Sequence, residues 1–158
     1  MILEALRQLL IDRALDTSGD LYGALFVDGG DTLVTDDGLS LSSSITTTGA
    51  ATKIFIGAMP LTIVPGIRLM ILPPGGADAE VPGIHRSYVQ AAARADSWQA
   101  AFNLALATGE ALTFDFTTAP GVEISSSRPW TPTPFALGRE EGAHWLMAVN
   151  FTVVWKRK

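Results

Sequence analysis

The sequence contains no cysteine, and this absence excludes a disulfide-stapled scaffold and thiol catalysis. Charge is also scarce, because charged residues make up 17% of the chain, against about 25% in a typical soluble domain. Apolar residues reach 47%. Small polar side chains or contacts with other subunits must therefore cover much of the surface. The composition leaves two interpretations open, a subunit of an assembly or an ordinary soluble monomer with Ser/Thr-rich loops.

Basic charge and long apolar runs are missing as well. The chain carries 11 basic and 16 acidic side chains, a net charge of -5, whereas a sequence-independent nucleic-acid binder needs a basic surface. A ring through which nucleic acid passes without binding is still compatible with this charge. No stretch approaches the roughly 18 uninterrupted apolar residues of a membrane-spanning helix, and the charged first residues do not resemble a signal peptide. We expect neither specific nucleic-acid binding nor a membrane partner.

Sequence motifs typical of enzymes are absent. There is no GxGxxG after a strand, no GxxxxGK[ST] and no GxSxG. His85 and His144 lie far apart in the sequence and outside HxxxH or HxH spacing, so a shared metal ion is not predicted. We therefore predict no enzyme, no cofactor and no metal site. A catalytic set scattered along the chain is the alternative that the motifs leave open.

Two acidic clusters have simpler explanations than catalysis or cation binding. Asp36-Asp37 lacks the spacing of a calcium-binding loop and suits a turn. Glu140-Glu141 resembles an acid–base pair, but adjacent side chains of an extended segment point apart. Arg139 stands beside them, which favours salt bridges at a surface.

Two helices are predicted. Residues 2–15 place apolar side chains at three- and four-residue steps, which indicates an amphipathic helix of about four turns. A second helix is expected to begin at Asp96, because Asp96 and Gln99 form a capping-box pattern. It is expected to end at Gly109.

The last strand is the strongest strand prediction. From Trp145 to Trp155 the chain has no charge, no glycine and no proline, and it alternates two mostly apolar faces. Such a strand is typical of the centre of a sheet with both sides covered. A strand at residues 66–72 is expected to end at Pro73-Pro74. Residues 128–142, with three prolines, are expected to form a long loop. Further strands are predicted at residues 21–27, 53–57, 85–94, 112–116 and 122–127.

This order of elements predicts an α+β fold, with a mixed and mostly antiparallel sheet flanked by two helices. We expect residues 1–158 to form one domain. Residues 28–51 are polar and rich in Ser, Thr and Gly, and they form a hairpin insertion turning at Asp37-Gly38 or a flexible surface loop. A hairpin this polar has no core of its own, so it would stay mobile or dock on a neighbour.

Four segments in order, KIFIGAMP at 53–60, GIRLMILPPGG at 66–76, SYVQAAARADSWQAAFNLA at 87–105 and PFALGREEGAHWLMAVNFTVVW at 134–155, resemble the tail terminator or minor capsid (neck) family of long-tailed phages. Glu140 stands where the family favours Asp, and Ala143-His144 replaces its usual basic residue. The segment 28–51 resembles an insertion. The positions that match the family pattern are Ile54, Phe55, Gly57, Pro60, Val89, Gln90, Arg94, Ala95, Ala101, Pro134, Leu137, Gly138, Glu141, Gly142, Asn150 and Phe151.

The resemblance implies a structural virion protein of the tail or neck that assembles in the host cytoplasm. It implies a homo-oligomeric ring, a hexamer in the family, at the head-proximal end of the tail tube. There the ring would end polymerisation of the tail tube protein and meet the head–tail connector or stopper protein. Alternatives are a head-completion or stopper protein, a tail-tube subunit, a small-ligand-binding domain and an acidic adaptor. The residues that we expect at subunit or ring contacts are Arg139, Glu140, Glu141, Trp130, Asp36 and Asp37.

Overall fold

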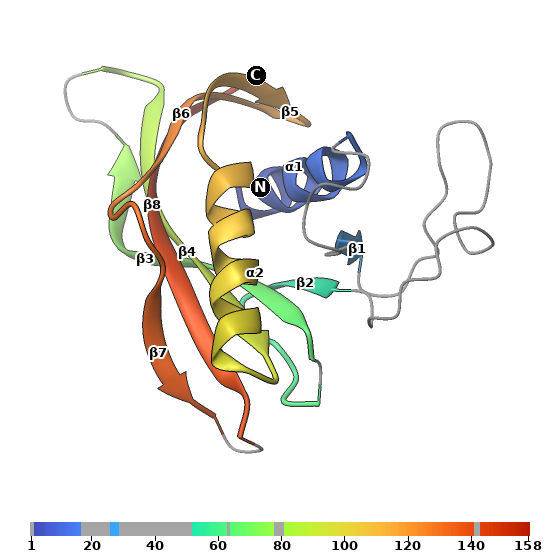
Figure 1. Ribbon diagram of the computed structural model, residues 1–158. Coiled ribbons are helices and arrows are strands. Elements are labelled where there is room, and N and C mark those ends of the chain that lie inside the picture. Colours follow the sequence, from blue (N-terminus) through green and yellow to red (C-terminus); the bar gives the residue numbers. More distant parts are fainter. Residues whose placement is uncertain (1, 17–25, 29–51, 63, 78–80, 141–142) are drawn as a thin grey trace.

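The computed structural model describes residues 2–16, 26–28, 52–62, 64–77, 81–140 and 143–158 (Figure 1). Asp36, Asp37 and the predicted 28–51 hairpin lie, apart from residue 28, outside these ranges. The elements are α1 (Ile2–Asp16), β1 (Phe26–Asp28), β2 (Thr52–Ile56), β3 (Gly66–Ala77), β4 (Ile84–Ala95), α2 (Trp98–Ala111), β5 (Phe114–Ala119), β6 (Val122–Pro129), β7 (Phe135–Arg139) and β8 (Trp145–Arg157).

The described strands form one mixed sheet in the order β1-β2-β3-β4-β8-β6-β5, with β7 also paired to β8. The pairs β1–β2 and β2–β3 are parallel, and the other pairs are antiparallel. The predicted α+β fold with a mixed, mostly antiparallel sheet is confirmed. β8 is central, as expected, because β4 lies along one side of it and β6 and β7 share the other (Figure 1).

Both helices cover the same face of the sheet. Apolar side chains of α1 and α2 join those of the strands in one buried cluster, which includes Leu6, Leu104, Ile67, Val89 and Val149. Successive side chains of β8 alternate between the two faces, and every second one from Met147 to Trp155 belongs to this cluster. We call this the inner face of the sheet, and the opposite one the outer face.

The outer face is covered only in part. At one end, Met59 and Phe55 pack on Ala92, Leu146 and Ala148, which form a small second cluster. Further along β8, Asn150, Thr152 and Val154 are half-buried. The expectation that β8 is covered on both sides therefore holds at its amino-terminal end, while the outer face beyond Ala148 stays partly accessible.

Helix α2 begins and ends one turn or less from the predicted positions. The N-cap is Ser97 rather than Asp96: the Ser97 hydroxyl accepts a hydrogen bond from the Ala100 amide at 3.1 Å. Gly109 does not end the helix, which continues to Ala111. It lies inside the helix against Val149 of β8, and a Cβ added there would meet the Val149 methyl groups at ordinary contact distances.

Two strand boundaries were predicted wrongly. β3 continues through Pro73-Pro74 to Ala77, and a register shift between Leu72 and Gly76 absorbs the prolines, which lack amide donors. Residues 128–142 are not one long loop, because β6 extends to Pro129 and β7 forms at Phe135–Arg139. β7 forms by pairing with β8. Gly138, with φ of 123°, lies at a register shift in this pairing.

Candidate assembly interface

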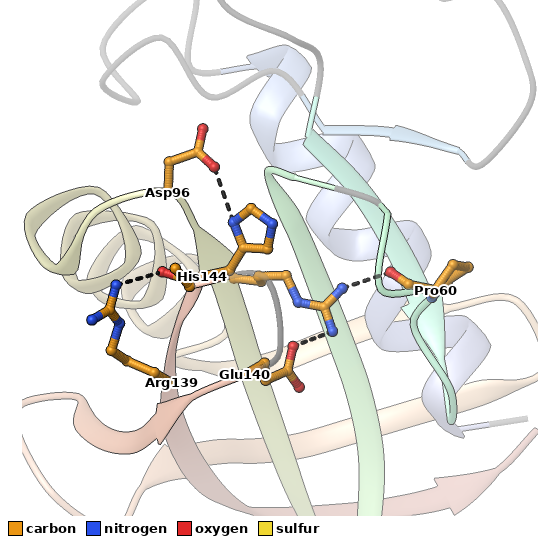
Figure 2. A network of polar contacts seen from close by, with 7 residues as sticks. Pro60, Asp96, Arg139, Glu140 and His144 are labelled. Carbon is orange, nitrogen blue, oxygen red and sulfur yellow. Dashed lines mark hydrogen bonds and ion pairs between the residues drawn. The ribbon is translucent and has the colours of Figure 1, made fainter.

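A buried arginine organises one end of the outer face. Arg94, near the end of β4, is only 2% exposed. Its Nη1 donates a hydrogen bond to the Pro60 carbonyl oxygen at 2.6 Å, and its Nη2 forms an ion pair with the Glu140 carboxylate (Figure 2). A buried guanidinium is stable only when its charge is compensated and its donors are used. In the sequence, Arg94 is one of the matched motif positions and follows three alanines.

This cluster joins three segments that are distant in the sequence. Pro60 belongs to the connector after β2, Arg94 to β4, and Glu140 follows β7. The junction of β4 and α2 also contacts the segment just before β8, since the Asp96 Oδ1 lies 3.0 Å from the His144 Nδ1 (Figure 2). We call the part of the surface formed by these segments the latched rim.

The turn between β7 and β8 is held by backbone and side chain together. The Glu140 amide donates to the His144 carbonyl at 3.0 Å, and the Ala143 amide donates to the Glu140 carbonyl at 3.1 Å. Arg139 donates from Nη2 to the Ala143 carbonyl at 3.3 Å, and its guanidinium lies 5.3 Å from the centre of the Trp145 ring. Arg139 therefore contacts its own turn and Trp145, while Glu140 pairs with Arg94 and not with Arg139. Their role between subunits stays a prediction.

Trp130 lies on the outer face, away from the latched rim. Its Nε1 donates to the Thr152 Oγ1 at 2.9 Å, and its ring meets Tyr88 edge-on at 5.6 Å. It is nevertheless 52% exposed. Beside it, the Gln90 Nε2 donates to the Asn150 Oδ1 at 3.0 Å. This part of the outer face combines apolar area with fixed polar groups, which is typical of interfaces. Glu141, Asp36 and Asp37 lie outside the described residues.

A pocket of about 320 Å³ opens between the carboxyl-terminal half of α2 and the proline-rich segment that joins β6 to β7. Leu106, Gly109 and Val149 line its floor side, and Glu110 is an exposed residue of its lining. The remaining lining residues are Thr113, Pro129, Thr131, Pro132 and Pro134. No sequence motif predicted this pocket, because its lining comes from the end of α2, the segment from Pro129 to Pro134 and Val149 of β8, which are distant in the sequence.

His85 lies near the start of β4, and His144, just before β8, lies near its other end. His85 stacks on Trp155, with ring centres 4.6 Å apart, and His144 contacts Asp96. Among the described residues, no three His, Asp or Glu side chains gather closely enough to hold a metal ion. Neither α1 nor α2 combines the length and apolar character that crossing a membrane requires, in the part of the chain described.

An exposed pair at the other end of the sheet perturbs one carboxyl group. The Lys156 Nζ lies 2.7 Å from the Glu123 Oε2. The hydrogen bond from Lys156 lowers the pKa of Glu123 below its usual 4.5, with a smaller contribution from the positive charges of Lys156 and Lys158. This is a surface pair.

Comparison with known proteins gives a distant fold likeness. No protein-family description and no curated protein matches the chain. Among solved structures, the fold is similar to a chain of the virion of a native gene transfer agent particle, at 14% identity and a TM-score of 0.47. The match covers 65% of this chain and 78% of that one. At this level the likeness assigns no function.

Proposed function

We propose that this chain is a structural, non-catalytic virion protein that forms a ring at the head-proximal end of a phage tail tube. In this role it ends tube polymerisation and joins the tail to the head connector. The gene transfer agent particle is also a virion, but a likeness at this TM-score supports no assignment. The proposal rests on the sequence motifs and on how the structure uses them.

The observation that carries the proposal is the convergence of the motif segments. Pro60, Arg94 and Glu140 come from three separate segments of the family pattern, and they meet at the buried Arg94 side chain. Glu140 departs from the favoured Asp but keeps the carboxylate that pairs with Arg94. Gln90 and Asn150, two further matched positions, are hydrogen-bonded to each other. Residues of a chance resemblance would have no reason to contact one another.

The surface also suits an assembly. Large apolar side chains are exposed on several elements, among them Trp98, Phe116, Trp130, Phe135 and Leu137. Strand β7 pairs only with β8 among the described strands, which leaves a short edge. In a ring, neighbouring subunits would cover such area.

A genetic deletion in the producing virus tests the proposal. Without the chain, we expect tails of irregular length and heads that lack tails, both scored by electron microscopy. Supplying the wild-type chain from a plasmid should restore them, and a labelled copy should map to the head–tail joint. Normal tail length and normal joining in the deletion would refute the proposed role.

A further inference from the structure

Phe116, in the middle of β5, is exposed in an unusual way. Its side chain is 86% accessible, the largest value among the exposed large apolar residues of the described chain. Its φ is 47°, in the left-handed region that residues with a Cβ rarely adopt. Both features are unfavourable for an isolated subunit.

The sheet holds Phe116 in this conformation. On either side of it, Asp115 pairs with Ser126 and Thr117 with Ile124, while Phe116 and Ser125 form no pair. Ser125 also marks the register shift between β6 and β8. The β5–β6 and β6–β8 pairings are therefore both irregular at Ser125, and beside this irregularity the Phe116 ring points outward.

The same chain carries an apolar pocket that suits a phenyl ring. An apolar cavity of about 150 Å³ is enough for benzene, and the pocket beside α2 has about 320 Å³. Its lining includes Leu106, Val149 and three prolines, which offer apolar contact, and Glu110 is the one charged residue among the lining residues described.

Charge around the two features is complementary. Arg128 forms an ion pair with Asp115, the residue before Phe116, so a guanidinium lies on the same hairpin as the exposed ring. Glu110 is exposed in the pocket lining. When the ring of one copy enters the pocket of another, Arg128 approaches the carboxylate of Glu110, and a guanidinium has donors for two carboxylates.

We propose that Phe116 of one copy inserts into the pocket lined by Leu106, Gly109, Pro132 and Val149 of a second copy. Phe116 is not among the lining residues of the pocket, so the contact joins two unlike sets of residues. Repeated head-to-tail, such a contact closes into a ring when the rotation permits. The inference names a subunit contact of the proposed ring and rests on that function. A small molecule in the pocket would leave the exposure of Phe116 unexplained.

Cross-linking between two variants tests the contact, and the absence of cysteine makes the background clean. Phe116→Cys and Pro132→Cys are purified separately, mixed at high concentration and oxidised. We expect covalent dimers in the mixture and few in either variant alone. Leu61→Cys, which replaces another exposed apolar side chain, is the matched control with Pro132→Cys. No more dimer with Phe116→Cys than with Leu61→Cys would overturn the inference.

Phe116→Gly supplies a second readout. Glycine accepts a positive φ without strain, so the thermal unfolding midpoint of the subunit should stay equal or rise. Self-association, measured by light scattering over a concentration series, should weaken at least tenfold, whereas Leu61→Ala should leave it unchanged. Unchanged association in Phe116→Gly refutes this contact alone. The ring function is judged separately, by the tail phenotype of the deletion.

Discussion

The latched rim and the β5–β6 hairpin are built in opposite ways. At the rim, a guanidinium that is 2% exposed binds two segments, and a turn closes over it. In the hairpin, the ion pair Asp115–Arg128 is exposed on both partners. Exposed pairs are worth about 0–1 kcal/mol, while removing one partner of a buried pair costs several times more. The rim is thus fixed by buried charge, and the hairpin by its strand ladders.

Glu140→Ala should have the largest effect, because it leaves the buried Arg94 charge unpaired. We expect the free energy of unfolding to fall by about 3 kcal/mol, the lower end of the range since Glu140 is 25% exposed. Urea unfolding at neutral pH measures it. The double variant Arg94→Met/Glu140→Ala removes both charges and should recover most of the loss. A loss below 1 kcal/mol in the single variant would show that the rim is not held by this pair.

Ser97→Ala should rank next. It removes the side-chain acceptor of the Ala100 amide, and the loss of an N-cap costs about 1 kcal/mol. Asp96→Ala is the matched control, because its carboxylate contacts His144 and does not cap the helix. We expect a smaller loss there by thermal unfolding. A larger loss of stability in Asp96→Ala than in Ser97→Ala would indicate that Asp96 is the N-cap.

Gly109→Ala should stabilise the fold. An added Cβ would meet the Val149 methyl groups at 3.6 and 3.8 Å, ordinary contact distances, and alanine favours a helix over glycine by about 0.5 to 1 kcal/mol. Chemical unfolding checks this. Destabilisation would mean that α2 and β8 have no room to separate slightly.

Lys156→Met should have the smallest effect on stability. The pKa of Glu123 should return toward its usual value, which NMR titration of the carboxyl group detects. A lowered folded pKa contributes stability above the unfolded pKa, and this contribution disappears as the pH falls through the folded value. The difference between the variant and the wild type should therefore be present at neutral pH and vanish in acid. A pH-independent difference would assign the effect to packing of the lysine chain.

The sequence predicted the elements whose signal is local and repeated. The alternation of β8 identified a central strand, and the periodicity of α1 identified its buried side. Features that depend on contacts between distant segments were missed. β7 has only five residues beside prolines and a glycine, so pairing with β8 decides it. Ser97 and not Asp96 is the cap because α2 begins at Trp98, one residue later than the capping-box pattern predicts.

The candidate interface was predicted less well for the same reason. Arg139, Glu140 and Trp130 were identified from charge and aromatic character, and the structure places the first two at the latched rim and the third on the outer face. Arg94 was recognised as a motif position, but its burial follows from the Pro60 carbonyl and Glu140 carboxylate, which come from other parts of the chain. Phe116 was missed because no local pattern reports a positive φ at an aromatic residue.

One guanidinium that holds a connector, a strand end and a turn has a consequence for recognition. These three segments cannot shift independently, so a protein that binds this edge of the molecule contacts a preorganised surface. Less conformational entropy is then lost on complex formation. A substitution of Arg94 that breaks these contacts would weaken such a complex even where no atom of the binding surface is altered.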